Sequence, residues 1–173
     1  HIFCNLSACA KTQFSLATNY SIILSLAEIL PQKGTIDDPC LGNIIACLHN
    51  LSLSKDLSHL TGLTQNRVLL QVVGQFGGSN SLIVSDFLLN LCRAYSQHPD
   101  VLDRVVCAGA VVTLITNIVS ISFDPNIVQT CFGILNVLKS IPIVITQLFD
   151  NLSFLEILCR SISPTHNFVD AAT

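Results

Sequence analysis

Apolar residues recur along this chain at the i, i+3, i+4, i+7 spacing that puts side chains on one face of a helix. Four such stripes occur, and the last keeps the spacing with a polar final member. A strand would instead show apolar residues with a period of two, so the stripes predict buried helices. The stripes are Ile23, Leu26, Ala27 and Leu30; Leu69, Val72, Val73 and Phe76; Val111, Leu114, Ile115 and Ile118; and Phe154, Ile157, Leu158 and Ser161.

A second pattern, the dipeptide Asn-Leu, recurs at Asn5, Asn50 and Asn90, and Asn136-Val137 is a fourth copy, at intervals of 45, 40 and 46 residues. Each stripe begins 18 to 21 residues after one of these asparagines. Two features in a fixed register indicate an internal repeat of about 42 residues. The apolar segments that carry the last three copies are 41–53, 82–94 and 127–139.

Glycine and proline divide each repeat into three helices. Pro99 and Pro142 stand where a short first helix is expected to begin, a position that tolerates the missing N–H. Gly109 breaks the apolar run between a first and a second helix. The predicted unit is therefore a short first helix, a buried second helix and a longer third helix. Loop signals between second and third helices lie at 31–39, 77–80 and 120–125.

This organisation resembles the armadillo repeat family. The resemblance is clearest from Asp100 to Ser140, where Gly109-Ala110-Val111 is similar to the opening of the family's second helix. The endings Asn5-Leu6-Ser7 and Asn50-Leu51-Ser52 are similar to the end of its third helix.

The resemblance implies an all-α fold, an armadillo-like right-handed α-solenoid of about four three-helix repeats. We expect a single domain whose first and last repeats are incomplete, so that both ends look cut from a longer chain. The expected units are 1–10, 11–53, 54–95, 96–140 and 141–173.

Burial explains why such units stack. One unit cannot cover its own apolar stripes, whereas a second helix enclosed by its neighbours is covered on all sides. This accounts for the uncharged runs at 68–85 and 105–123, which otherwise suggest membrane spans. Both runs contain polar residues and neither is flanked by an asymmetric cluster of Lys and Arg, so a membrane-embedded helical bundle is the weaker alternative.

The side of each third helix that lies opposite its core residues can be laid out at about 100° per residue. Stacked units would join these lines into one surface, which we call the third-helix face. Resemblance to the family implies that it forms a concave groove in which the asparagines hydrogen-bond the backbone of an extended peptide. The alternative is that each Asn ends its helix or bonds a neighbouring turn. The third-helix face comprises Asn43, Ala46, Asn50, Ile83, Asp86, Asn90, Arg93, Gln129, Phe132, Asn136 and Lys139.

Differences from the family's groove residues limit the kind of partner that we expect. Import receptors of this type carry Trp four residues before the groove Asn, where this chain has Ala46, Asp86 and Phe132, and the chain has no Trp. Recognition of a nuclear signal is therefore disfavoured. Arg93 and Lys139 form the one matched basic pair on the face. A mixed, weakly charged groove favours a protein partner bound mainly through apolar and backbone contacts.

The amino-acid composition excludes several classes of protein. Half of the 173 residues are apolar and 11% are charged, which rules out a disordered chain, and a net charge of −3 disfavours nucleic acid as a partner. The eight cysteines show no Cys-x-x-Cys pair, and most lie in apolar stretches. We expect buried free thiols and hence a reducing, cytoplasmic location, with cytoskeletal or ciliary association as an option.

Catalysis has little support in the sequence. The five histidines are scattered, and neither a Gly-x-Ser-x-Gly elbow nor a phosphate-binding glycine motif occurs. The pair Asp37-Asp38 reads as a solvated turn rather than a metal site. We predict a non-catalytic interaction scaffold without cofactor or metal. The alternative is a structural spacer that binds through its ends or its convex side.

Overall fold

The computed structural model describes residues 2–30, 39–75, 81–112, 114 and 125–162. Within these ranges all regular structure is helical and no strand occurs, so the all-α prediction is confirmed there. The helices are α1 (Ile2–Ala8), α2 (Ala10–Ala17), α3 (Tyr20–Ile29), α4 (Pro39–Ser52), α5 (Leu57–Leu60), α6 (Asn66–Val73), α7 (Ser81–Ala94), α8 (Pro99–Cys107), α10 (Pro125–Leu138), α11 (Pro142–Phe149) and α12 (Leu152–Ile162).

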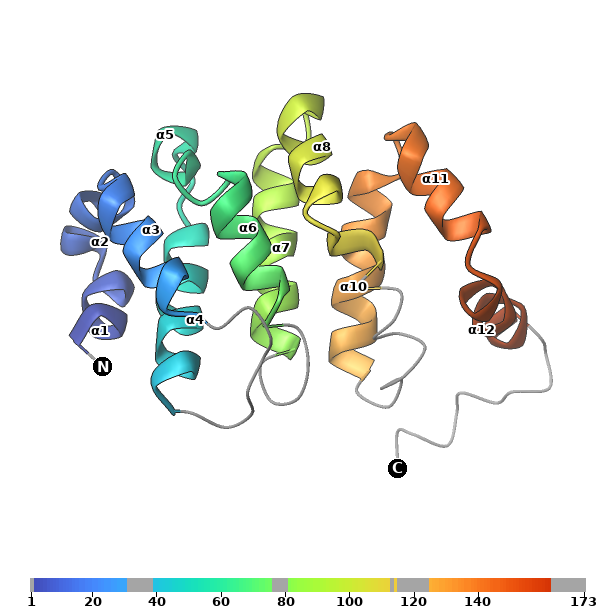
Figure 1. Cartoon of the computed structure of the whole chain (residues 1–173), viewed down its shortest axis with the longest axis horizontal. Coiled ribbons are helices and arrows are strands. Elements are labelled where there is room, and N and C mark those ends of the chain that lie inside the picture. Colours follow the sequence, from blue (N-terminus) through green and yellow to red (C-terminus); the bar gives the residue numbers. More distant parts are fainter. Residues whose placement is uncertain (1, 31–38, 76–80, 113, 115–124, 163–173) are drawn as a thin grey trace.

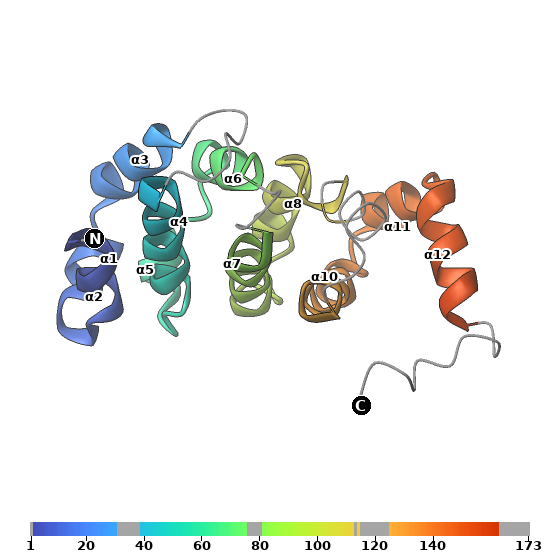
Figure 2. The ribbon, with the colours of Figure 1, turned by 90° about the horizontal axis from the view of Figure 1, so that it is seen from below.

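Helices α1, α4, α7 and α10 stand side by side in chain order (Figures 1 and 2). Helix α4 contacts both α1 and α7, and α7 contacts both α4 and α10. The helices α2, α5, α8 and α11 follow one edge of this row, and α3 packs against α6 in front of it (Figure 1). The three long helices of the row, α4, α7 and α10, are each preceded by shorter ones.

The predicted stripes form the core wherever the structure describes them. Ile23, Leu69 and Leu114 are fully buried, as expected for second helices covered by neighbours. On α4, the apolar residues opposite Asn50 are also covered: Ile44 is half-buried, and Leu41, Ile45, Leu48 and Leu51 are buried. Other buried stripe residues are Leu26, Ala27, Leu30, Val72, Val73, Val111 and Phe154. Predictions for Phe76, Ile115, Ile118, Asp37, Asp38, the connectors 31–38, 77–80 and 120–124, and the side chains of Ile157, Leu158 and Ser161 lie outside the described residues.

Proline marks helix starts more widely than the sequence suggests. Pro99 and Pro142 begin α8 and α11, as predicted. Pro39 and Pro125, which the sequence analysis assigns to connectors, are instead the first residues of α4 and α10. A proline at this position loses no hydrogen bond because the first N–H groups of a helix have no partner within it. Pro39 and Pro125 therefore belong to helices rather than to connectors.

Gly109 is needed where α8 ends. Its φ of 80° lies in the left-handed region, and its N–H donates to the Val106 carbonyl at 2.9 Å. A side chain in this conformation is strained, whereas glycine adopts it freely and commonly follows the last helical residue. The predicted break between first and second helices is therefore a turn of this kind.

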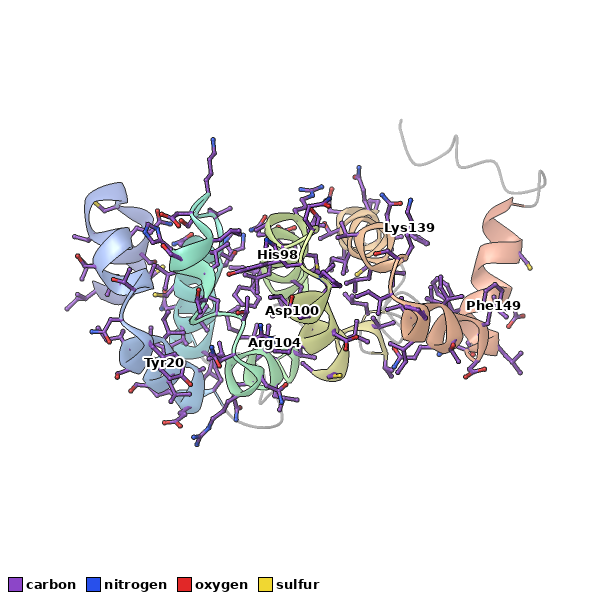
Figure 3. All side chains as sticks on the ribbon, turned by 90° about the horizontal axis from the view of Figure 1, so that it is seen from above. Tyr20, His98, Asp100, Arg104, Lys139 and Phe149 are labelled. Carbon is purple, nitrogen blue, oxygen red and sulfur yellow. The ribbon has the colours of Figure 1, made fainter. Side chains whose placement is uncertain are left out.

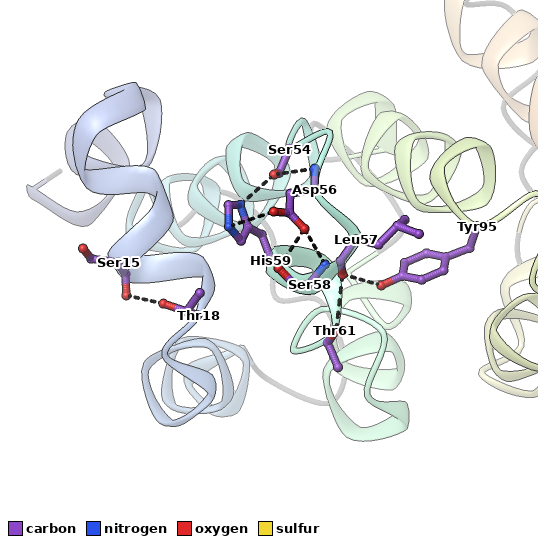
Figure 4. A network of polar contacts seen from close by, with 9 residues as sticks. All are labelled: Ser15, Thr18, Ser54, Asp56, Leu57, Ser58, His59, Thr61 and Tyr95. Atoms are coloured by element: carbon purple, nitrogen blue, oxygen red, sulfur yellow. Dashed lines mark hydrogen bonds and ion pairs between the residues drawn. The ribbon is translucent and has the colours of Figure 1, made fainter.

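Polar contacts tie the short first helix α5 to its neighbours (Figure 4). Asp56 caps α5 by accepting from the Ser58 N–H at 2.9 Å. The Tyr95 hydroxyl, just after α7, donates to the Leu57 carbonyl at 2.9 Å. These bonds hold the start of α5 against the end of α7.

The expectation of buried thiols is wrong for half of the cysteines. All eight are free, but Cys9, Cys40, Cys107 and Cys159 are exposed and Cys4 is half-buried. An apolar neighbourhood in sequence does not bury a residue that lies on the outer side of a helix or at its end. The buried ones are Cys47, Cys92 and Cys131.

No helix in the described part of the chain has the length and apolar character that a membrane span requires. The uncharged run at 68–85 belongs to two helices, since α6 ends at Val73 and α7 begins at Ser81. Much of the run at 105–123 lies outside the described residues.

Candidate functional site

All eleven residues of the third-helix face lie on the three neighbouring helices α4, α7 and α10, or directly after α10. Arg93, Gln129, Asn136 and Lys139 are exposed, and the other seven are half-buried. Figure 3 shows Lys139 on one side of the molecule, away from Tyr20 on α3 and Phe149 on α11.

Asn50 hydrogen-bonds the preceding third helix. Its Nδ2 lies 3.2 Å from the hydroxyl of Ser7 on α1. That hydroxyl already donates its single hydrogen to the Cys4 carbonyl at 2.7 Å, so toward Asn50 it can only accept. The amide of Asn50 is therefore oriented with Nδ2 toward α1.

Asn90 repeats this arrangement one unit later. Its Nδ2 donates to the Ser52 hydroxyl on α4 at 3.1 Å, and Ser52 donates to the His49 carbonyl at 2.7 Å. We call each such pair, Asn50 with Ser7 and Asn90 with Ser52, an Asn–Ser latch. No described residue donates to Oδ1 of either asparagine. Each latched amide keeps a carbonyl oxygen and one N–H for other partners.

Asn136 is not latched in this way. The serine position of the pattern, two residues after the preceding Asn, holds Cys92. The amide oxygen of Asn136 instead accepts from the Lys139 ammonium at 2.9 Å. The asparagines on α4 and α7 therefore donate to a serine of the neighbouring helix, whereas Asn136 on α10 accepts from Lys139.

The contact between α7 and α10 is made by other side chains. Thr130 donates to the Asp86 carboxylate at 3.3 Å, and the Ser85 hydroxyl lies 3.9 Å from the Cys131 thiol. A Cβ on Gly133 would sit 3.3 Å from a methyl carbon of Leu89, so this glycine lets the helices approach closely. Asp86 thus has an internal partner as well as partial exposure.

Two apolar members of the face are partly committed to packing. Ile83 and Phe132 pack against the buried core. The Phe132 ring also lies 6.4 Å, between centroids, from that of Phe154 on α12. These two side chains therefore add apolar, only partly exposed surface to the third-helix face.

The periodicity of the sequence does not reveal the partners that orient the asparagines. Ser7, Ser52, Thr130 and Gln13 make contacts to the third-helix face from neighbouring helices, Gln13 by donating to the Asn50 carbonyl at 2.6 Å. A signal for the serines exists, since both recurring Asn-Leu-Ser endings contain one. The sequence does not show which asparagine each serine meets, because these hydrogen bonds join different helices.

A separate open cleft of 670 Å³ lies where α8 meets the start of α11. Asp100 and Asp103 line it, and Asp100 lies 3.8 Å from the Arg104 guanidinium on the same helix. Within the described ranges, no group of three or more His, Cys, Asp or Glu side chains is arranged to hold a metal ion. The cleft shares no residue with the third-helix face.

Comparison with protein-family models, curated proteins and solved structures finds no significant match.

Proposed function

We propose that this chain is an armadillo-like right-handed α-solenoid that binds an extended peptide of a protein partner along the third-helix face. The support for the solenoid is the order of short and long helices and the side-by-side row of α1, α4, α7 and α10. The proposed role is non-catalytic, uses no cofactor, and belongs in the reducing cytoplasm, where eight free thiols persist.

The observation that carries the proposal is the orientation of Asn50 and Asn90. Each latch leaves an acceptor oxygen and one N–H, the two groups that meet the N–H and C=O of a peptide backbone. Because the serines hold the amides in place before binding, less side-chain entropy is lost when a peptide arrives. The latches thus serve both stacking and recognition.

The dimensions fit a short peptide. The axes of packed helices lie about 8–10 Å apart, so the distance from α4 across α7 to α10 is roughly 20 Å. An extended chain covers that distance with about six residues at about 3.3 Å each.

A selection experiment tests the proposal. A displayed library of random peptides of about ten residues, longer than the expected contact, is selected on the 173-residue chain. The double variant Asn50→Ala with Asn90→Ala should bind the selected peptides at least about tenfold more weakly. The control Asn66→Ala changes an exposed asparagine on α6 and should leave binding unchanged. Equal binding by folded double variant and wild type would refute the third-helix face as the site.

A second candidate, the structural spacer that associates through its ends, is favoured by one observation. Ile143, Phe149 and Leu152 on α11 and α12 are 50%, 66% and 79% exposed, which gathers apolar surface near one end of the row. If this role is the main one, Phe149→Ser with Leu152→Ser abolishes association with a cytoskeletal or ciliary assembly. The asparagine variants would then have no effect.

A further inference from the structure

Two of the eight cysteines stand on either side of the contact between α1 and α4. Cys4 on α1 is half-buried, and Cys47 on α4 is 1% exposed. The Cys47 thiol and the Ser7 hydroxyl are hydrogen-bonded to each other. The same hydroxyl donates to the Cys4 carbonyl at 2.7 Å. A single serine hydroxyl therefore links the Cys47 sulfur to the backbone of Cys4.

The register of the two helices brings the thiols to matched positions. Nδ2 of Asn50 on α4 lies 3.2 Å from the Ser7 hydroxyl on α1. Cys4 precedes Ser7 by three residues and Cys47 precedes Asn50 by three, so each cysteine shares a helix face with one member of this pair. Helices α1 and α4 run in the same direction in Figure 1. One turn back from the Ser7–Asn50 hydrogen bond, both helices thus carry a cysteine.

The electrostatics of the buried thiols distinguish this pair from the other cysteines. Burial is the largest cause that raises the pKa of Cys47, and the charge of Cys4 raises it further. Like charges act on each other in this way only when they lie close together. Burial also raises the pKa of Cys92 to about 12 and that of Cys131 to about 11, but no described cysteine contributes to either value.

The chemistry that two adjacent thiols share is exchange with a disulfide. Cys4 is the more accessible thiol, so its thiolate attacks one sulfur of a small disulfide such as oxidised glutathione. The reagent's S–S bond breaks, one glutathione leaves as a thiolate, and Cys4 carries the other. Cys47 then releases its proton to water and attacks the Cys4 sulfur, which expels the second glutathione thiolate. The two cysteines lose two electrons and oxidised glutathione gains them, while the two released protons are taken up by the glutathione thiolates.

We propose that Cys4 and Cys47 form a dithiol modification site that reacts with a small-molecule disulfide and closes a bond between α1 and α4. In a reducing compartment both thiols stay free, and the bond forms when the glutathione pool becomes oxidised. The bond fastens α1 to the helix that carries Asn50. The inference concerns the packing of these two helices and does not depend on peptide binding.

Peptide mapping can assign the bond after one change to the chain. Each cysteine of the pair shares its tryptic segment with an exposed cysteine, Cys9 in segment 1–11 and Cys40 in segment 34–55. The test therefore uses the full chain with Cys9→Ser and Cys40→Ser, in which a link between these segments can only join the proposed pair. The folded chain is incubated with oxidised glutathione at about pH 8, the remaining thiols are blocked, and the tryptic digest is analysed by mass spectrometry.

We expect the two segments to be joined in most molecules, while segment 68–93, which carries the buried Cys92, stays unlinked. The linked chain should unfold in urea at a midpoint about 1 M higher than the reduced chain, because the bond restricts the unfolded state. If the folded chain stays unlinked, the inference is overturned. A linked chain whose midpoint is not higher overturns it too, because such a bond does not fit the native packing.

Single replacements in the same background test the order of the two steps. Cys47→Ser should leave glutathione attached to Cys4, since no second thiol is present to expel it. Cys4→Ser should leave Cys47 as a free thiol, because that side chain is buried. Cys47→Ala repeats the first test if the serine variant does not fold. Glutathione on Cys47 in the folded Cys4→Ser variant would contradict the assignment of Cys4 as the thiol that reacts first. None of these measurements involves a peptide, so their outcome is independent of the proposed function.

Discussion

Ser52→Ala removes the acceptor of one latch and gives the sharpest test of what orients Asn90. The Ser52 hydroxyl is buried, accepts from Asn90 at 3.1 Å and donates to the His49 carbonyl at 2.7 Å. Leaving a half-buried amide N–H without an acceptor costs about 1–2 kcal/mol. Alanine offsets up to about 0.5 kcal/mol of this loss because it is a better helix former than serine. The expected net loss in the free energy of unfolding is about 1 kcal/mol.

Urea unfolding followed by circular dichroism measures this loss, and a double-mutant cycle assigns it. If the latch is real, Ser52→Ala costs much less in the Asn90→Ala background, with a coupling energy of about 1 kcal/mol. The control Ser25→Ala changes an exposed serine in α3 and should shift stability by less than about 0.5 kcal/mol. Equal costs of Ser52→Ala with and without Asn90 would refute the argument that these side chains interact.

Three further predictions concern the backbone, the thiols and acid stability. Gly109→Ala should cost about 1–2 kcal/mol in urea unfolding, because φ is 80° while no atom lies within 4 Å of the added Cβ; an unchanged midpoint would contradict the backbone argument. A thiol reagent at about pH 8 should label the exposed Cys107 fast but spare Cys92 and Cys131, since burial raises the pKa of Cys92 to about 12 and that of Cys131 to about 11. The folded pKa values of Cys92 and Cys131 exceed the unfolded value of 9.0. The stability that these buried thiols contribute is therefore present below pH 9.0 and is lost as the pH rises toward about 11. A rise in the free energy of unfolding over that pH range would contradict this prediction. Hydrogen bonds from Ser58 hold the pKa of Asp56 below 3.8, so its contribution to stability is present above that pH and is lost as the pH falls through the folded pKa; Asp56→Asn, which still caps α5, should flatten this part of the acid unfolding curve.

The spacing of the apolar residues predicts the helices and their buried sides because burial is a property of spacing. A stripe such as Ile23 to Leu30 is buried wherever it stacks, so the sequence alone places the core. Exposure of an individual cysteine is harder to predict. Cys9 and Cys107 lie next to apolar residues, but Cys9 stands between α1 and α2 and Cys107 is the last residue of α8.

The candidate site is predictable to the level of the helix face but not of the hydrogen bond. The angular layout puts Asn50, Asn90 and Asn136 on one line, and the structure finds them on three adjacent helices. Which hydrogen-bonding groups an amide leaves unbonded depends on a hydroxyl from another helix. It also depends on the acceptor to which that hydroxyl donates its own hydrogen. No periodicity within one helix contains this information, and the replacement of serine by Cys92 gains its meaning only after stacking.

The most direct measurement of the central claim is the NMR spectrum of the side-chain amides during titration with a selected peptide. The Nδ2 signals of Asn50 and Asn90, assigned through their alanine variants, should shift together with the progress of binding. The signal of the exposed Asn66 on α6 should stay in place. Saturated binding that moves Asn66 or the α11 backbone, and leaves both latched asparagines unchanged, would contradict a peptide site on the third helices.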